Sequence, residues 1–388
     1  MKTNNNIPAY RFQGYTDAWE LRKLNNIADV RDGTHNSPRY IEFGYPLVTS
    51  KNIKNGQVNF EDIQYISSFD YEEINKRSKV NINDILMGMI GTVGNLALVR
   101  EEPKFAIKNV ALIKNIGVVN VEFLYHYLGS YVIERQLQNS LDGGTQKFIS
   151  LNKIRHLDIT FPSLPEQEAI GTFFSTLDRH ITLHQRKLDT LKEQKKAYLK
   201  LLFPAKGQTK PALRFQGFED DWEEVKLGEL CDIRTGKLDA NAMVENGEYD
   251  FYTSGIKKYR IDVAEFEGPA ITIAGNGATV GYMHLADGKF NAYQRTYVLT
   301  NFKVDRSYIF SEIAKKLPIK IQQEARTGNI PYIVLSMLTE LSISIPTLPE
   351  QEAIGTFFQN LDQEIAQVED KLASLKEMKK TLLRKLFV

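Results

Sequence analysis

Two near-identical copies of one motif stand far apart in the sequence, and this repeat constrains the fold more than any other feature. The segment PSLPEQEAIGTFF at residues 162–174 recurs as PTLPEQEAIGTFF at 346–358. A second repeat lies upstream, where PAYRFQG at 8–14 recurs as PALRFQG at 211–217. Because repeated segments mark repeated structural units, the chain is predicted to contain one structural plan twice.

Similarity between the two copies is concentrated at their ends. Beyond the openings, matches continue through Trp19, Lys23, Leu24, Arg31 and Gly33 in the first copy and through Trp222, Lys226, Leu227, Arg234 and Gly236 in the second. A weaker echo relates GMIGTVG at 88–94 to GNGATVG at 275–281, and the remaining middles barely agree. The doubled plan therefore predicts a common frame that carries two different sets of loops.

A long helix is predicted to begin at each LPEQEAI segment. Ser163 with Glu166, and Thr347 with Glu350, have the spacing of a capping box, and a proline occupies the tolerant first turn of each helix. The apolar positions that follow alternate at spacings of four and three, which is the heptad pattern of a coiled coil. This seam comprises Ile170, Phe174, Leu177, Ile181, His184, Leu188, Leu191, Lys195, Tyr198 and Leu202 in the first helix, and Ile354, Phe358, Leu361, Ile365, Val368, Leu372, Leu375, Lys379, Leu382 and Leu386 in the second.

Three polar residues stand at seam positions. His184 is predicted to be a packed seam residue and not a metal ligand. Lys195 and Lys379 are expected to bury their aliphatic stems and to extend their amines toward solvent. The seam is therefore expected to remain an apolar pairing surface along its whole length.

The short connection between the copies favours antiparallel pairing of the two helices. Each helix has about 40 residues and is thus roughly 60 Å long. The linker at 204–213 reaches at most about 35 Å, so the second domain must lie near the end of the first helix and the start of the second. An antiparallel pair meets both demands and predicts two domains at opposite ends of a rod, related by a pseudo-twofold axis. Homodimerisation through one helix is the alternative.

The predicted fold class is α+β, with two mixed α/β domains separated by two long antiparallel coiled-coil helices. Short apolar runs bounded by Gly, Asn or Asp predict strands, at 46–49, 85–87, 96–99, 270–273 and 296–300. Helices are predicted at 121–137 and 307–325, and the order of the strands cannot be read from the sequence. The predicted divisions are a first domain at 1–161, a helix at 162–203, a linker at 204–213, a second domain at 214–345 and a helix at 346–388.

Signatures of catalysis, metal binding and secretion are missing from the sequence. It has no phosphate-binding GxxxxGK[ST] loop, no GxSxG elbow, no Asn-Pro-Pro-aromatic motif and no histidine pair at metal-ligand spacing. The glycine-rich segment at 275–281 is interpreted as a turn between strands. A polar N-terminus without an apolar core, together with a single cysteine, Cys231, predicts a protein of the reducing cytoplasm. No catalytic site, metal or cofactor is expected on this chain.

The order of domain, LPEQEAI helix, domain and LPEQEAI helix resembles the specificity (S) subunits of type I restriction–modification enzymes. Two duplicated features carry this resemblance over essentially the whole chain. They are the LPEQEAI helices and the domain openings at Arg11–Trp19 and Arg214–Trp222. The resemblance implies two target recognition domains, each of which reads one half of a bipartite, asymmetric DNA site.

The resemblance also implies the partners. The helices would act as a ruler and would dock two methyltransferase subunits that use S-adenosylmethionine to methylate adenine, while restriction subunits with ATP-driven activity join that core. S-adenosylmethionine, ATP and magnesium would therefore belong to partner subunits. The net charge of +1 argues mildly against DNA binding, but partner subunits would supply part of the phosphate contact.

Polar loop residues are the candidates for DNA contact, because base edges are read by amide, hydroxyl and basic side chains. The first-domain candidates are Arg31, Thr34, His35, Thr49, Ser50, Lys51, Asn52, Lys108, Asn109, Thr145, Gln146 and Lys147. The second-domain candidates are Arg234, Lys237, Thr253, Ser254, Lys257, Asn276, Tyr293, Gln294, Arg295 and Thr296. A solvated turn is the structural alternative for each, and Tyr293 could equally belong to the core.

A non-enzymatic coiled-coil scaffold that binds protein is the alternative function. Salt-sensitive, sequence-dependent DNA binding in the presence of a methyltransferase would separate the two hypotheses, because a scaffold would show none. A fused restriction–modification enzyme would need a methyltransferase or nuclease motif, and the sequence contains neither.

Overall fold

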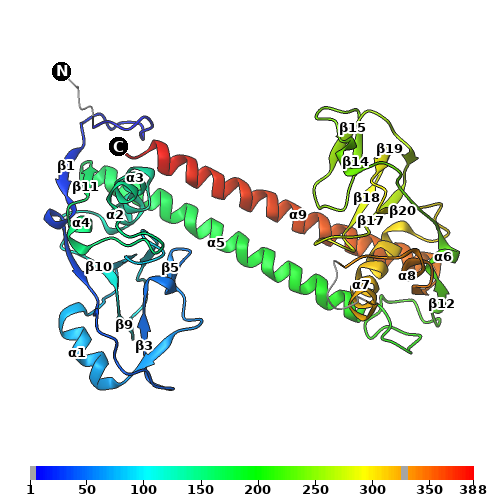
Figure 1. Cartoon of the computed structure of the whole chain (residues 1–388), viewed down its shortest axis with the longest axis horizontal. Helices are drawn as coiled ribbons and strands as arrows, with labels where there is room; N and C mark the ends of the chain where they lie inside the picture. Colours follow the sequence, from blue (N-terminus) through cyan, green and yellow to red (C-terminus); the bar gives the residue numbers. More distant parts are fainter. Residues whose placement is uncertain (1–5, 325–330) are drawn as a thin grey trace. The chain divides into compact units, whose positions relative to one another are not determined.

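The computed structural model describes residues 6–324 and 331–388, which fall into two compact units (Figure 1). The first unit comprises the chain through His184 together with Lys371–Val388, and the second comprises Gln185–Asp370. Each unit therefore contains one α/β body and a segment of both long helices. Residues 1–5 at the start of the chain and Ala325, the predicted end of a helix, lie outside the described residues.

Two sheets and two strand pairs form the α/β body of the first unit. The larger sheet is antiparallel with the order β2-β10-β7-β8, formed by Ala28–Asp32, Val110–Asn115, Ile85–Gly88 and Leu96–Leu98. The smaller sheet has the order β6-β3-β9, formed by Gln64–Ile66, Tyr45–Val48 and Ala106–Ile107, with β3 parallel to β9. Strand β1 (Glu20–Lys23) pairs with β11 (Asp158–Phe161), and the short β4 (Ile53–Lys54) pairs with β5 (Gln57–Val58).

The α-helices of the first unit are α1 (Ser68–Ser78), α2 (Val121–Leu128), α3 (Tyr131–Ser140) and α4 (Leu151–Arg155), together with the first part of the long α5 (Leu164–Leu201). The single helix predicted at 121–137 is wrong, because the chain forms two helices there. Gly129 ends α2 by donating its N–H to the Tyr125 and Tyr127 carbonyls, and Ser130 is the N-cap residue of α3. The apolar period alone could not reveal this break, because it continues across it.

The second unit has the same kinds of element. Its antiparallel sheet has the order β13-β20-β17-β18, formed by Asp232–Thr235, Thr296–Thr300, Ala270–Ala274 and Met283–Ala286. Its other sheet has the order β15-β14-β19-β16, formed by Tyr259–Ile261, Tyr249–Tyr252, Lys289–Ala292 and Phe266–Glu267. Strand β12 (Glu223–Lys226) pairs with β21 (Ser342–Ile345). The α-helices are α6 (Leu227–Leu230), α7 (Arg306–Glu324) and α8 (Leu335–Thr339), together with the first part of the long α9 (Leu348–Lys385).

The strand orders show that the internal repeat extends through the dissimilar middles. β2-β10-β7-β8 corresponds to β13-β20-β17-β18, and the parallel pair β3–β9 corresponds to β14–β19. The pair β1–β11 likewise corresponds to β12–β21. Among the described residues, α1 and the pair β4–β5 have no counterpart in the second unit, and β16 has none in the first. The two copies therefore share a backbone frame even where their sequences do not match.

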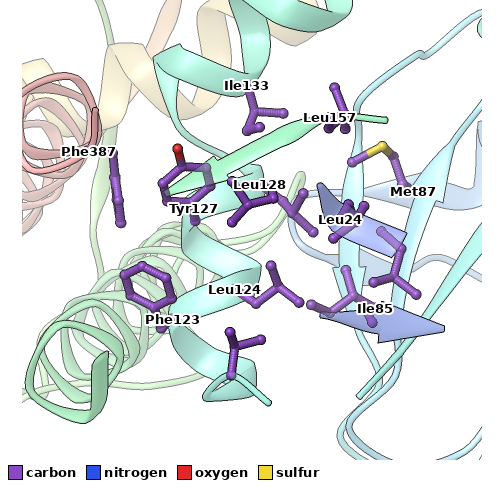
Figure 2. Packing of buried hydrophobic residues seen from close by; sticks show 14 of the residues in the cluster. Leu24, Ile85, Met87, Phe123, Leu124, Tyr127, Leu128, Ile133, Leu157 and Phe387 are labelled. Carbon is purple, nitrogen blue, oxygen red and sulfur yellow. The ribbon is translucent and has the colours of Figure 1, made fainter. Parts of the chain in front are cut away.

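An aromatic cluster in each unit receives the Leu-Phe sequence at the end of a long helix. In the first unit, the ring of Phe387 lies 5.3 Å from Tyr127, 5.9 Å from Phe123 and 5.7 Å from Phe174, measured between centroids (Figure 2). In the second unit, Phe203 occupies the same place beside Trp222, Tyr308 and Phe358. The ends of the helices are thus part of the domain cores.

The two long helices pair in the antiparallel direction within each unit, as the linker length predicted. In the first unit, Phe174 and Asp178 of α5 meet Phe387 and Lys379 in the opposite order. In the second unit, Lys195 and Tyr198 of α5 meet Asp362 and Phe357 of α9, again in opposite order. The seam residues Ile170, Phe174, Leu177, Leu188, Leu191, Ile354, Phe358, Leu361, Ile365, Val368, Leu372 and Leu375 are all buried, and Ile181 is half-buried. The pairing is intramolecular.

Both seam lysines form ion pairs across the helices. Lys379 lies 2.5 Å from an Asp178 oxygen, and Lys195 lies 2.5 Å from an Asp362 oxygen. These pairs occupy equivalent places in the two units, whereas simple extension into solvent was expected. Because each lysine is satisfied by one aspartate, the two pairs favour a single register of the helices.

The glutamate of each LPEQE segment binds the arginine of the domain opening. Arg11 donates from Nε and Nη2 to the two carboxylate oxygens of Glu166, at 2.7 and 2.6 Å, and the Glu166 side chain is fully buried. Arg214 and Glu350 form the same bidentate pair, at 2.7 Å for both bonds. The capping-box role predicted for these glutamates is therefore wrong, since both oxygens serve the stronger charge-assisted pair.

The next glutamine fastens the helix to its own domain. Gln167 donates to the Pro162 carbonyl at 2.8 Å and accepts the Asn120 N–H at 2.8 Å, while Asn120 caps α2 through its side chain. A Cβ on Gly171 would lie 2.9 Å from the Asn120 oxygen, so only glycine permits this approach. In the second copy, Gln351, Pro346, Asp305 and Gly355 make the same arrangement at the start of α7. The repeated motif is a structural joint.

Replacing Glu166 with alanine should lower the free energy of unfolding of the first unit by about 3–5 kcal/mol, because it leaves a largely buried Arg11 charge without its partner. The exposed Glu168 in the same turn provides the control, and its alanine variant should stay within about 0.5 kcal/mol of the parent. Urea unfolding followed by circular dichroism measures both. Equal losses in the two variants would contradict the structural role of the Arg11–Glu166 pair.

The helix pair should weaken in acid through Asp178. Burial raises the pKa of its carboxyl, but the hydrogen bond from His126 and the charge of Lys379 outweigh burial and hold the pKa below its ordinary value. A carboxyl with a lowered folded pKa stabilises the fold above its unfolded pKa, and that stabilisation is lost as the pH falls through the folded pKa. The difference in unfolding free energy between the parent and Asp178→Asn should therefore shrink from about pH 7 to about pH 2.

Candidate nucleic-acid interface

Five loop segments of the first unit come together where the strands of its two sheets end. We call this set the first rim: residues 34–37, 49–52, 88–94, 108–109 and 143–148. Thr34 forms a parallel bridge with Lys108, and Gly91 donates its N–H to the Lys147 carbonyl at 2.9 Å. The repeated Gly33 permits the crossing between sheets, because a Cβ there would lie 2.2 Å from the Ile107 carbonyl oxygen.

Ser50 is the hub of the first rim. Its buried hydroxyl accepts the N–H groups of Met89 and Ile90 at 2.9 and 3.2 Å and donates to the Asn109 carbonyl at 2.9 Å. The Thr92 hydroxyl donates to the Ser50 carbonyl at 2.7 Å. One serine thus holds three of the five segments in fixed positions.

A chain of polar contacts reaches the surface beside this hub. Asp32 is buried, and its two carboxylate oxygens bind Arg77 from α1 and the Nε2 atom of His35, the latter at 2.7 Å. The other ring nitrogen of His35 is hydrogen-bonded to the side chain of Asn109 at 2.8 Å. The exposed His35 ring is therefore fixed at both of its nitrogens.

The second unit has an equivalent set of loops. We call it the second rim: residues 237–238, 253–255, 275–279, 293–295 and 331–333. Leu238 bridges Tyr293, and Asn276 bridges Tyr332. Ser254 donates to the Asn276 side-chain oxygen at 2.5 Å and accepts at its carbonyl from the Thr279 hydroxyl. The second rim thus repeats the serine–threonine contact of the first with different surrounding side chains.

A family model described as "Type I restriction modification DNA specificity domain" matches this chain at residues 16–193 and again at 219–377. The chain belongs to this family of type I DNA specificity subunits. It is therefore a specificity subunit and not a catalytic subunit. The two matched segments each contain one of the rims.

Curated relatives agree with this assignment, and a solved structure has a similar fold. The EcoDI specificity subunit of Escherichia coli is 37% identical over 164 residues, which cover 42% of this chain and 36% of that protein. A putative MjaX specificity subunit of Methanocaldococcus jannaschii is 23% identical over 406 residues, covering 94% of this chain and 92% of that protein. The fold resembles the crystal structure of a type I S subunit from M. genitalium, with a TM-score of 0.75 and 19% identity over 98% of this chain and 99% of that one.

Unpaired positive charge marks the rims of this specificity subunit. Lys108 donates to the Ser37 hydroxyl at 2.6 Å, and Lys147 donates to the Gly143 carbonyl at 3.0 Å, so neither amine is neutralised by these bonds. In the second rim Lys237 pairs with Glu265, but no carboxylate of the described residues pairs with the exposed Arg295. Local charge of this kind suits phosphate contact despite a net charge near zero.

Most of the predicted DNA-contacting residues lie on the two rims. They are Thr34, His35, Thr49, Ser50, Lys51, Lys108, Asn109, Thr145, Gln146 and Lys147 on the first rim and Lys237, Thr253, Ser254, Asn276, Tyr293, Gln294 and Arg295 on the second. Ser50 and Thr253 are buried, so they shape the rims from within. DNA contact by any of these residues stays a prediction.

Five candidates lie away from the exposed rim surfaces. Arg31 on β2 donates to Asp29 at 2.8 Å, and Arg234 on β13 stacks over Phe266. Asn52 is 2% exposed and its side-chain oxygen accepts from Thr49, while Thr296 is 1% exposed in β20. Lys257 stacks over Tyr259 beside β15. Their polar groups are used within the domains or lie outside the two rims.

Sequence reasoning missed Thr92, Thr279, Asp32 and Arg77 as residues that build the rims. The two threonines stand at the same place in the echo between 88–94 and 275–281. Their identity in both copies was therefore a usable signal. Asp32 and Arg77 had no such signal, because their contact joins β2 to a helix present only in the first unit.

Replacing Ser50 with alanine should loosen the loop at 88–94 by leaving the Met89 and Ile90 amides without an acceptor, at a cost of about 1–3 kcal/mol. Hydrogen exchange measured by mass spectrometry should show faster exchange of this loop. Ser37→Ala removes an exposed hydroxyl from the same rim and should leave the hydrogen exchange of the loop at 88–94 unchanged. Unaltered exchange in the Ser50 variant would show that the hydroxyl does not hold the loop.

Proposed function

We propose that each rim of this specificity subunit reads one half of a bipartite, asymmetric DNA site. One observation carries the proposal: two rims with different side chains stand on the same backbone frame. Such an arrangement supports recognition of two different half-sites by one chain, because protein geometry sets the spacing of half-sites. The double-stranded DNA would meet each rim through both its phosphates and its base edges.

Different rim residues would do different work. Lys108, Lys147 and Arg295 carry charge that suits phosphate oxygens, which adds affinity but no sequence information. The amide, hydroxyl and imidazole groups of the rims suit base edges in the major groove, where each base pair has its own donor and acceptor pattern. We exclude four residues from direct base reading: Asn52, Thr296, Arg31 and Arg234.

The paired helices would set the spacer between half-sites and dock two methyltransferase subunits, through which restriction subunits join. The ion pairs Asp178–Lys379 and Lys195–Asp362 support a fixed helix register, which a ruler requires. S-adenosylmethionine, ATP and magnesium would be held by those partners alone, and this chain would bind no cofactor. Among the described residues, no helix is long and apolar enough to cross a membrane, and no His, Cys, Asp and Glu side chains form a group suited to a metal.

We propose that the complex acts in the cytoplasm. The single cysteine supports this placement, because one thiol cannot form an internal disulfide. Cys231 is buried, and burial raises its pKa to about 12. Such a thiol stays protonated and unreactive at neutral pH, so it serves as a small apolar core residue.

Co-expression with its methyltransferase subunits tests this proposal. The chain should purify as a complex that binds a subset of DNA sequences and loses affinity steeply as salt rises. Deleting the gene for this chain from the host should abolish the adenine methylation. A stable complex without any sequence-dependent DNA binding would favour the scaffold hypothesis instead.

Lys108→Ala should weaken binding to all DNA sequences alike and reduce the slope of log affinity against log salt by about one. The reason is that the variant loses one phosphate contact and therefore releases fewer counterions on binding. Lys210→Ala provides the control, because that amine is paired with Asp221 at 3.1 Å. An unchanged slope in the Lys108 variant would remove this residue from the phosphate contacts.

A further inference from the structure

We propose that Asn109 and Gln294 are the residues with which the two domains each read an adenine. The inference rests on the proposed DNA-reading function and selects one equivalent position from each rim. A carboxamide stands at that position in both domains, although the surrounding sequences differ. Four observations carry the inference: the backbone equivalence, the chemistry of the side chain, the support beneath Asn109 and the exposure of Gln294.

In the first unit, Asn109 ends the loop that follows β9. Its N–H donates to the Thr34 carbonyl at 3.2 Å, and the preceding Lys108 N–H donates to the Val48 carbonyl at 2.9 Å. These bonds fix the residue at the junction between the small sheet and the large sheet. Asn109 also has a positive φ of 53°, a conformation that asparagine tolerates better than most residues.

In the second unit, Gln294 makes the same contacts after β19. Its N–H donates to the Leu238 carbonyl at 2.8 Å, and the preceding Tyr293 N–H donates to the Tyr252 carbonyl at 2.9 Å. Leu238 bridges Tyr293 as Thr34 bridges Lys108, and both bridges are parallel. Gln294 is therefore the backbone counterpart of Asn109, and the following Arg295 is an insertion before β20.

Carboxamides have the donor and acceptor pattern that matches adenine. In the major groove, an Asn or Gln side chain accepts from the N6 amino group of adenine and donates to its N7 atom. A carboxamide oxygen has two lone pairs and its nitrogen has two hydrogens. The side chain can therefore keep one contact with the protein while it engages the base.

Asn109 is held ready for such a contact. His35 binds its side chain, Asp32 binds His35, and Arg77 binds Asp32. Because Asp32 is buried, this chain of contacts starts from a fixed point inside the domain. A base-reading group must be positioned within a fraction of an ångström, and supporting hydrogen bonds of this kind provide that precision. His35 and Asp32 are positioning residues in this account.

Gln294 reaches the surface by a different route. The residue after Leu238 is Asp239, so no histidine stands there as His35 does after Thr34. Among the described residues, no hydrogen bond holds the exposed Gln294 side chain, whereas its backbone N–H is bonded to the Leu238 carbonyl. Asn276 is a poorer candidate because the echo between 88–94 and 275–281 places it opposite Met89, which is not a carboxamide.

Methylome sequencing of hosts that express the complete complex tests the inference. The parent chain defines the bipartite motif. Asn109→Ala should make one A·T position of a single half-site degenerate, and Gln294→Ala should do so only in the other half-site. In competition binding, changing that base pair should weaken the parent complex by roughly 5- to 150-fold, and the matching variant far less. Asn139→Ala, which removes an exposed carboxamide from α3, should keep the parent motif.

Asn109→Asp gives a sharper version of the same experiment. The aspartate keeps the shape of asparagine but cannot donate to adenine N7, and it can accept from the amino group of cytosine. We expect it to lose the adenine preference at that position and to tolerate cytosine. His35→Ala should lower discrimination at the same position without affecting the other half-site.

The outcomes separate the inference from the function beneath it. A parent complex that shows no bipartite motif overturns the proposed function and the inference together. A parent motif that survives unchanged in the assembled Asn109→Asp or Gln294→Ala complex overturns the inference alone. Degeneracy at a G·C position would also overturn it, because the adenine assignment would then be wrong.

Discussion

The buried ion pair between the arginine of each domain opening and the glutamate of each long helix is the contact on which the rest of the structure depends. Arg11 reaches Glu166 across 155 residues of sequence, and Arg214 reaches Glu350 across 136. Each pair brings the first residues of a domain against the first turn of the helix that follows it. The neighbouring glutamine then accepts the N–H of the residue that caps α2 or α7, so that domain and helix meet at a fixed joint.

A fixed joint explains how one frame can carry two unlike rims. The joint and the aromatic cluster that receives Phe387 or Phe203 are built from residues outside the rim loops. The strands that support the rims have the same order in both units. Substitutions in the rims therefore need not disturb the core. This separation fits the sequence pattern, in which the ends of the two copies agree and their middles diverge. The chemistry that the two copies share is structural, while the chemistry that differs lies on the rims, which we propose read DNA.

Much of the architecture could be predicted from local patterns, and the rest depended on long-range contacts. The heptad spacing predicted the seam from Ile170 to Leu375, and the linker length predicted antiparallel pairing, because both follow from helix geometry. The break at Gly129 was missed because the apolar period continues across it. The partner of Glu166 was missed because a capping box and an arginine far upstream can both use the same glutamate. The rims were predicted as polar loops, but which loops meet, and that Ser50 joins them, follows only from the strand order. The equivalence of Asn109 with Gln294 was likewise hidden, because an insertion and unlike neighbours separate them.

Exchange of one recognition domain would show whether the two rims stand independently on a common frame. Residues 1–161 would be replaced by the matching domain of a relative whose half-site is known, keeping an arginine at the place of Arg11, and the host methylome would be sequenced. In the new motif, one half-site should be that of the donor. The other half-site and the spacer length should stay the same. A change in both half-sites, or in neither, would contradict the independence of the two rims.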